Sequence, residues 1–439
     1  MIIRNAKLIF FTDVAITLFS VVSSLVGARA LGPAGRGDLL LITLWPILIA
    51  MLIEMGLPNA YRYWTAKDPA RISALFSNAI IYTLAMSVIS FVVGGLLVPR
   101  LLGQRDSQVM LLVRIYMINI GGVVMLSLMR GLLEGTRRFG WSGAARFIFF
   151  GVQAIGFAVL WSVGRLTVAT ATYTMILSQA VSMSLAIGAV IRQLHPRWQP
   201  SWREFRTSMS YGLRDYAGVL ADYATLRLDQ LVLGATATNS AVGLYVVAVR
   251  LSEMTTFIAG AAADALMPEV ARSGKDDRPE ALLAKTLRLT LYANLIILVP
   301  LWIAAPVMLR ILFGSSFVAA TSAFRWLLIA AIAWSAGSIV IRGLQGFGYP
   351  GMTTIARFFS AGVTVVALVV LLPRMGITGA AIASLIGYSV LFGVSLFALI
   401  QRRRLAVWQY LRPQRHDIPF AQLRSIANLS LLSARSTEG

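Results

Sequence analysis

Three aspartates spaced seven residues apart are the first feature of this sequence that could do chemistry. Asp215, Asp222 and Asp229 lie in a stretch that is otherwise largely apolar. On an α-helix, seven residues fall about 20° short of two full turns, so the three carboxylates project from nearly one face. A carboxylate in an apolar segment is costly unless it meets water or a partner charge. We therefore expect this face to line a cavity, with Asp215 alternatively only capping the start of its helix.

A second group of charged residues follows in the next apolar stretch. Arg250 and Glu253 are three residues apart, and Asp264 lies two heptads after Arg250. Residues three apart share one face of a helix, so Arg250 and Glu253 can pair there. Arg227 lies within the aspartate-rich stretch, and we expect it to point into the same cavity. The charges of the second stretch are equally consistent with an ion pair that only stabilises its helix.

These side chains suit the binding of an anion together with the uptake of an ion. A guanidinium group keeps its charge and binds phosphate through two parallel hydrogen bonds. A carboxylate in a cavity can take up and release a proton. The candidates for substrate binding are Arg227, Arg250, Arg29 and Arg114. The candidates for ion coupling are Asp222, Asp229, Glu253, Asp13, Glu54 and Asp264.

Several of these residues also have simpler interpretations. Arg114 can reach lipid headgroups by snorkelling from its apolar segment. Asp222 and Asp229 can instead form a buried salt bridge. Arg146 and Arg357 could guide an anionic headgroup toward the cavity, but basic anchors at the ends of apolar segments are the simpler explanation.

The elements that must position these residues are membrane-spanning helices. The chain has 439 residues, of which 58% are hydrophobic and 13% charged. A typical soluble protein is about half apolar and about a quarter charged, so the composition excludes a soluble globular protein. A span needs about 20 mainly apolar residues. Twelve segments qualify: 8–30, 38–58, 76–98, 108–130, 143–163, 168–191, 212–235, 241–267, 287–308, 319–341, 352–372 and 377–400.

The basic residues predict how these spans are oriented. The chain has 39 Lys and Arg against 18 Asp and Glu. Most of the Lys and Arg fall in the loops and tails that lie on the same side of the membrane as the N-terminus. The positive-inside rule therefore places both termini in the cytoplasm and explains the net charge of +21 without nucleic acid as a partner. We treat the first segment as a retained span rather than a signal peptide, because it is too long and carries Asp13.

Other kinds of site are excluded or not expected. The chain has no cysteine, and its two histidines lie in polar segments, so we expect no metal site. It contains no Gly-x-x-x-x-Gly-Lys-Ser/Thr loop, so we expect no bound nucleotide or other cofactor.

The second half of the chain repeats features of the first. The segment Arg130–Gly135 matches Arg342–Gly346, and each is followed by an Ala-Arg-Phe triplet. Six spans per half is an even number, so the halves have the same orientation and a pseudo-twofold axis along the membrane normal. The predicted fold is all-α, with twelve transmembrane helices in two six-helix bundles around a central cleft. The predicted divisions are 1–192 for the first bundle, 193–211 for a cytoplasmic connector, 212–401 for the second bundle and 402–439 for a basic tail.

Three motifs give the sequence a family resemblance. Arg29-Ala-Leu-Gly-Pro-Ala-Gly-Arg-Gly37 follows the first span, Asp229-Gln-Leu-Val-Leu-Gly234 precedes Val242-Gly-Leu-Tyr245, and Met267-Pro268 ends the eighth span. Together they resemble bacterial O-antigen-type polysaccharide flippases of the multidrug/oligosaccharidyl-lipid/polysaccharide exporter superfamily, over about residues 1–400. The motifs are fairly specific for the polysaccharide branch and say little about the sugar.

The resemblance implies a transporter and not an enzyme. Such a protein would move an oligosaccharide on polyprenyl diphosphate, an O-antigen, capsule or exopolysaccharide repeat unit, from the inner to the outer leaflet of the bacterial cytoplasmic (inner) membrane. Its cationic cavity residues would correspond to Arg227 and Arg250. Its partners would be the lipid bilayer, a proton or sodium ion, and the polysaccharide polymerase and chain-length machinery.

Two departures from the family pattern affect the expected substrate: the first argues against lipid II, and the second keeps a multidrug exporter as the alternative. Lipid II flippases carry arginines within the first span, whereas this sequence has Asp13 there and no Arg between Lys7 and Arg29. Acidic residues also outnumber arginines within the spans, which keeps a cation-coupled multidrug exporter of the same superfamily as the alternative. A membrane enzyme such as a polymerase or ligase fits less well, because the outer loops are short and no histidine lies in a span.

Overall fold

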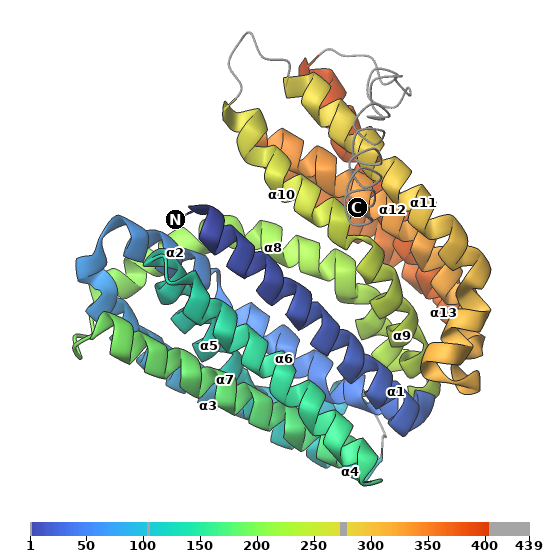
Figure 1. The fold of residues 1–439 in the computed structure, drawn as a ribbon, viewed down its shortest axis with the longest axis horizontal. Helices are drawn as coiled ribbons and strands as arrows, with labels where there is room; N and C mark the ends of the chain where they lie inside the picture. Colours follow the sequence, from blue (N-terminus) through green and yellow to red (C-terminus); the bar gives the residue numbers. More distant parts are fainter. Residues whose placement is uncertain (1, 103–105, 273–278, 404–439) are drawn as a thin grey trace, which may run out of the picture.

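The fold is helical throughout the residues that the computed structural model describes, which are 2–102, 106–272 and 279–403 (Figure 1). The first half contains α1 (Ile2–Glu54), α2 (Leu57–Lys67), a 3-10 helix (Pro69–Arg71), α3 (Ile72–Leu102), α4 (Ser107–Tyr116), α5 (Asn119–Gly135), α6 (Phe139–Ser162) and α7 (Val168–Leu194). The second half contains α8 (Trp202–Thr236), α9 (Asn239–Thr255), α10 (Phe257–Arg272), α11 (Pro279–Phe313), a 3-10 helix (Ser315–Ala320), α12 (Thr321–Gly346) and α13 (Pro350–Arg403).

Two of these helices are each long enough to cross the membrane twice. A straight helix as long as α1, with 53 residues, would measure roughly 80 Å, whereas the hydrocarbon core is about 30 Å thick. Both α1 and α13 are broken by a glycine in the left-handed region, Gly32 with φ 65° and Gly376 with φ 56°. Glycine adopts this conformation without the steric cost that a Cβ adds. Each helix therefore supplies two consecutive spans.

The remaining predicted spans also correspond to helices. Eight helical stretches of the described residues are long and apolar enough to cross a membrane, or nine if the bent pair α9 and α10 counts as one span. The α4 and α5 helices together form one of these eight stretches. The α8 helix has the length of a span, but its charges keep it outside that apolar set. When α1 and α13 are each counted twice, the bent pair α9 and α10 is counted as one span and α8 is included, the twelve predicted spans are confirmed.

One helix was not predicted. The span expected over 38–58 ends at Glu54, because Met55 and Gly56 adopt positive φ and turn the chain. The short α2 helix then begins with Pro58 in its first turn, and Tyr61 is fully buried against the first-half core.

The helices form two lobes with separate hydrophobic cores. We call α1 to α7 the N-lobe and α9 to α13 the C-lobe. The N-lobe core is centred on fully buried residues such as Leu41, Val113 and Leu128. The C-lobe core includes Tyr245 and Phe324. The apolar outer faces of α3, α11 and α13 are exposed, as expected of helices in contact with lipid.

The α8 helix connects the two lobes. Its first half packs on the N-lobe, where Tyr211 stacks on Tyr63 at 4.6 Å between ring centroids. Near this point Gly56 and Gly212 approach so closely that a Cβ on Gly56 would lie 2.4 Å from the Gly212 carbonyl oxygen. Its second half packs on the C-lobe through Asp229. The predicted boundary at 212 falls within α8, so the prediction places residues 202–211 in the cytoplasmic connector and residues 212–236 in the second bundle. In the structure this continuous helix contacts both lobes.

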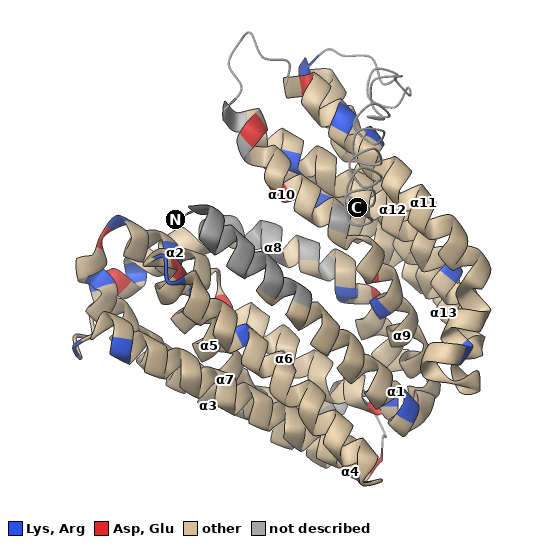
Figure 2. Ribbon diagram, in the orientation of Figure 1, with Lys and Arg blue, Asp and Glu red and all other residues tan. Residues whose placement is uncertain are grey.

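The lobes meet at one end of the molecule and diverge at the other. We call the end with Gly32, Gly164 and Gly314 the outer end, and the end with α2 the inner end, following the predicted orientation. Figure 2 shows Lys and Arg gathered along the inner end. There α10 and α11 stand away from α1 and α5 (Figure 1).

The contact at the outer end depends on two glycines of the sequence motifs. A Cβ on Gly37 would lie 1.8 Å from the Asn239 carbonyl oxygen, and one on Gly243 would lie 1.8 Å from the Pro33 carbonyl oxygen. The Asn239 side chain also donates a hydrogen bond to Asp38. The corner between the first two spans therefore packs directly, backbone to backbone, on the start of α9.

We predict that Gly243→Ala weakens this outer contact, because the added methyl group cannot fit beside Pro33 without moving α9. In a Ser20→Cys background, with the cysteine in the cavity described below, an impermeant maleimide added from the outer side should label the variant faster than the parent. The chain has no native cysteine, so the background is clean. Gly393→Ala is the matched control, since its Cβ meets open space. Equal labelling of Gly243→Ala and its parent would contradict the prediction.

Candidate functional site

A cavity of about 580 Å³ lies between the two lobes. Its walls come from the first span of α1 and from α6, α9, α10, α11 and α12, and they are mostly apolar. Among the described side chains, three charged residues line it: Arg146 of α6 and Arg250 and Glu253 of α9. This is the central cleft that the two-bundle architecture predicts.

A smaller and more polar cavity, of about 280 Å³, adjoins the first at Arg250, which lines both. Its walls come from the second span of α1 and from α6, α7, α8 and α9. Its polar lining residues are Arg36, Thr43, Gln153, Tyr223, Arg227, Gln230 and Arg250. Three guanidinium groups therefore face one small chamber.

Sequence reasoning missed Arg36, because this residue was counted as part of an outer loop. In the structure the Arg36 side chain donates a long hydrogen bond of 3.4 Å to the Ser24 hydroxyl, and its Nε is buried without a hydrogen-bond partner among the described residues. The signal that could have found it is its place in the motif that ends at Gly37.

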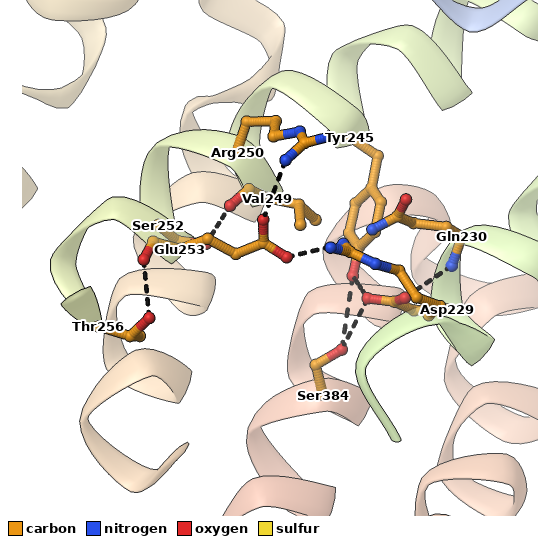
Figure 3. Close-up of polar contacts among 10 residues, drawn as sticks. Asp229, Gln230, Tyr245, Val249, Arg250, Ser252, Glu253, Thr256 and Ser384 are labelled. Atoms are coloured by element: carbon orange, nitrogen blue, oxygen red, sulfur yellow. Dashed lines mark hydrogen bonds and ion pairs between the residues drawn. The ribbon is translucent and has the colours of Figure 1, made fainter. Parts of the chain in front are cut away.

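The central ion pair joins α8 to α9 (Figure 3). Arg227 Nη1 lies 2.7 Å from one oxygen of Glu253, and Arg250 Nη1 lies 3.8 Å from the other oxygen. The side chains are 21%, 30% and 56% exposed for Arg227, Glu253 and Arg250, and this exposure is to the cavities that they line. The predicted pairing of Arg250 with Glu253 is thus present but loose, and the tighter partner of Glu253 is Arg227.

Hydroxyl groups hold both ends of the α9 helix, which carries Glu253 in its last turn. The Thr238 hydroxyl caps the start of α9 by accepting from the Ala241 amide. At the other end, the hydroxyls of Ser252 and Thr256 donate to carbonyls one turn back, on Val249 and Glu253. Such back-bonding often bends helices. Glu253 therefore lies just before the break between α9 and α10.

Asp229 lies outside both cavities, in a buried network that joins three helices. Its carboxylate accepts from the Tyr245 hydroxyl of α9 at 2.5 Å and from the Ser384 hydroxyl of α13 at 3.1 Å, and it also accepts from the Gln230 amide at 2.7 Å. The residue is 2% exposed. In this conformation Asp229 fastens α8 to the C-lobe (Figure 3).

The structure places the other candidates away from the cavities. Arg29 donates from Nε to the Leu312 carbonyl at 2.7 Å and also bonds the Ile311 carbonyl, so it caps the last turn of α11 at the outer end. Arg114 is exposed on α4, and Glu54 ends α1. Asp264 pairs with Arg342 at 2.9 Å between α10 and α12. The side chains of Asp13, Asp215 and Asp222 lie outside the described residues.

The charge of the cavities follows from these placements. Among the acidic side chains that the structure describes, Glu253 is the one that lines either cavity. The lining arginines are Arg36, Arg146, Arg227 and Arg250. Among the side chains that the structure describes, the excess of acidic residues within the spans therefore does not recur in the lining of the cavities. In the described part of the chain, no group of three His, Cys, Asp or Glu side chains could hold a metal ion.

We predict that Asp229→Asn lowers the free energy of unfolding by about 1–3 kcal/mol, because it removes two charge-assisted hydrogen bonds from a buried site. Tyr245→Phe removes one of the same bonds and should act in the same direction. The double variant should be less destabilised than the sum of the two, which thermal unfolding in detergent can measure. A stable Asp229→Asn variant that has lost ion dependence of transport would instead assign Asp229 to ion coupling.

Comparison with known proteins supports the fold and the family. A probable low-salt glycan biosynthesis flippase, Agl15 of Haloferax volcanii, is 23% identical over 223 residues. These are 50% of this chain and 46% of that protein, so the match spans less than half of the relative's length.

Two solved structures share the fold. The lipid II flippase MurJ in an inward closed conformation superposes with a TM-score of 0.76, at 13% identity, over 90% of this chain and 87% of that one. A multidrug resistance MATE transporter of the MOP superfamily in an inward-facing conformation gives 0.73, at 16% identity, over 89% of this chain and 96% of that one. At such low identities both likenesses concern the fold alone.

The family model for polysaccharide biosynthesis proteins matches residues 26–322, which include both halves of the outer contact and all of α8 and α9. This match covers more than half of the sequence. The chain therefore belongs to this family of polysaccharide biosynthesis proteins, and it is a multi-pass membrane protein with the fold of the MOP-superfamily transporters.

Proposed function

We propose that this protein is a flippase for an oligosaccharide carried on polyprenyl diphosphate, and that it moves this lipid from the cytoplasmic to the outer leaflet of the cytoplasmic membrane. The observation that carries the proposal is the charge of the described cavity lining: among the side chains that the structure describes, four arginines and one glutamate, which is already paired, line an interlobe space in a polysaccharide biosynthesis protein. A diphosphate is the part of such a substrate that requires cationic partners.

Arg250 is the best placed residue to receive the diphosphate. It is the most exposed of the three residues in the central ion pair, and its own contact to Glu253 is long at 3.8 Å. Because it lines both cavities, an anion bound there would also be near Arg227 and Arg36 on the polar side. The apolar walls of the larger cavity would then surround the less polar part of the substrate.

The arrangement of the lobes supports loading from the inner end. The outer end is held closed by the Gly37 and Gly243 contacts and by Arg29 on the end of α11. With both termini in the cytoplasm, the divergent end would face the leaflet in which the lipid-linked sugar is made. Transport would follow when the bundles rock about the site and exchange the closed end for the open one.

Ion-coupled alternating access requires an ionisable group at the site, and Glu253 is the carboxylate that the described structure places there. The structural likeness to multidrug transporters does not favour their kind of cargo, because a cationic drug would meet mostly guanidinium groups in these cavities.

We predict that cells depleted of this protein accumulate a polyprenyl-diphosphate oligosaccharide, detectable by lipid mass spectrometry. A rescue copy with Arg227→Ala and Arg250→Ala should leave the lipid accumulated, because the anion loses both central partners. A rescue copy with Arg374→Ala is the matched control and should clear it, since Arg374 is exposed and does not line the cavities. An unchanged lipid profile in depleted cells, with new sensitivity to cationic drugs, would contradict the flippase proposal and favour a multidrug exporter.

A further inference from the structure

Two arginines of the cavity share a single carboxylate. Glu253 holds Arg227 at 2.7 Å through one oxygen and Arg250 at 3.8 Å through the other. All three side chains line the connected cavities, Arg227 from α8 and Arg250 and Glu253 from α9. Any anion that uses these two guanidinium groups therefore competes with the Glu253 carboxylate for them.

The surroundings of Glu253 offer the carboxylate no other cation at hydrogen-bonding distance in the described contacts. Among the described side chains, the charged and titratable groups that face the cluster are Arg36 of α1, Arg146 of α6, Tyr223, Arg227 and Asp229 of α8, Arg250 of α9 and Tyr388 of α13. The cavity linings from α10, α11 and α12 are apolar, with residues such as Phe257, Leu301 and Phe324. When an anion binds both arginines, Glu253 loses its two ion-pair partners and faces a second negative charge, in a cavity whose other described cation is Arg146.

Protonation resolves this conflict. A neutral Glu253 no longer competes for Arg227 and Arg250, and it no longer repels a bound diphosphate. Linkage is reciprocal, so a proton that favours the anion is equally favoured by it. The geometry points to Glu253 as a proton-binding site whose occupancy rises together with that of the anionic substrate at Arg227 and Arg250. This inference rests on the function proposed above.

The direction of proton movement follows. Substrate loading at the open end transfers one proton from water to Glu253 as the Arg227–Glu253 ion pair opens. Substrate release at the other end lets the ion pair form again and returns the proton to water there. The proton thus accompanies the anion and is not exchanged for it.

The test is the pH dependence of anion binding to the full-length protein in detergent. Farnesyl diphosphate, a short polyprenyl diphosphate, is the probe, and isothermal titration calorimetry is the measurement between about pH 5 and about pH 8. For the wild-type protein the affinity should fall as the pH rises, by at most about tenfold per unit for a single linked proton. Titrations in two buffers of different ionisation enthalpy should show net proton uptake on binding.

Glu253→Gln keeps the shape of the side chain and removes its charge. This variant should bind the probe about as well as wild type at low pH and about tenfold more tightly or better at high pH. The probe also titrates, but it does so identically for both proteins, so their difference reports Glu253. Glu280→Gln is the matched control, because Glu280 also pairs with an arginine, Arg403 at 3.4 Å, but lies outside the cavities.

The outcomes separate the inference from the function beneath it. Binding by wild type with no proton uptake, and with the same pH profile as Glu253→Gln, would overturn the linkage and leave the flippase proposal standing. Absence of binding by every form at every pH would overturn the anion site and the proposed function with it. If Glu253→Gln does not fold, Glu253→Ala takes its place in the comparison with wild type, because it also removes the carboxylate.

Discussion

The cost of placing charge in an apolar membrane is the constraint on which this structure depends. Each charged group inside the spans must reach a partner or a cavity. In α8 both solutions occur within three residues, since Arg227 faces the cavities and Asp229 is enclosed by Tyr245 and Ser384. These opposite demands fix the rotation of the helix. Because α9 carries partners for both residues, Tyr245 and Glu253, the same demands fix α8 against α9.

Much of the fold could be predicted from the sequence, because apolar length and charge placement act locally. The twelve spans followed from apolar length, the central cleft followed from the repeat of six spans, and the pairing of Arg250 with Glu253 followed from helical periodicity. The α2 helix was missed because it is short and follows a turn that Met55 and Gly56 make with unusual backbone angles. The two spans within α1 were predicted. The turn between them at Gly32 was not, because the sequence marks it only by a Gly-Pro pair.

The site was harder to predict, because periodicity gives the face of a helix and not the neighbour that it meets. The stripe of aspartates was expected to reach water, and Asp229 instead meets two hydroxyls from distant parts of the chain. Arg29 was expected to bind substrate, and the structure places it on the end of α11. Arg36 enters the polar cavity only because the chain turns back at Gly32 and Gly37 can touch α9. Contacts between residues that lie far apart in the chain cannot be inferred from the spacing of residues along the sequence.

The carboxylate shared between Arg227 and Arg250 also has a consequence for energetics. In a cell with a negative interior, an anion moving outward releases about 2.3 kcal/mol per charge for each 100 mV of membrane potential. A diphosphate carries several negative charges, and a proton held on Glu253 cancels one of them. The membrane potential would then drive transport, and the protonation of Glu253 would set the net charge that moves across the membrane. The net charge of the bound diphosphate and proton would make such a transporter responsive to voltage without a dedicated sensor helix.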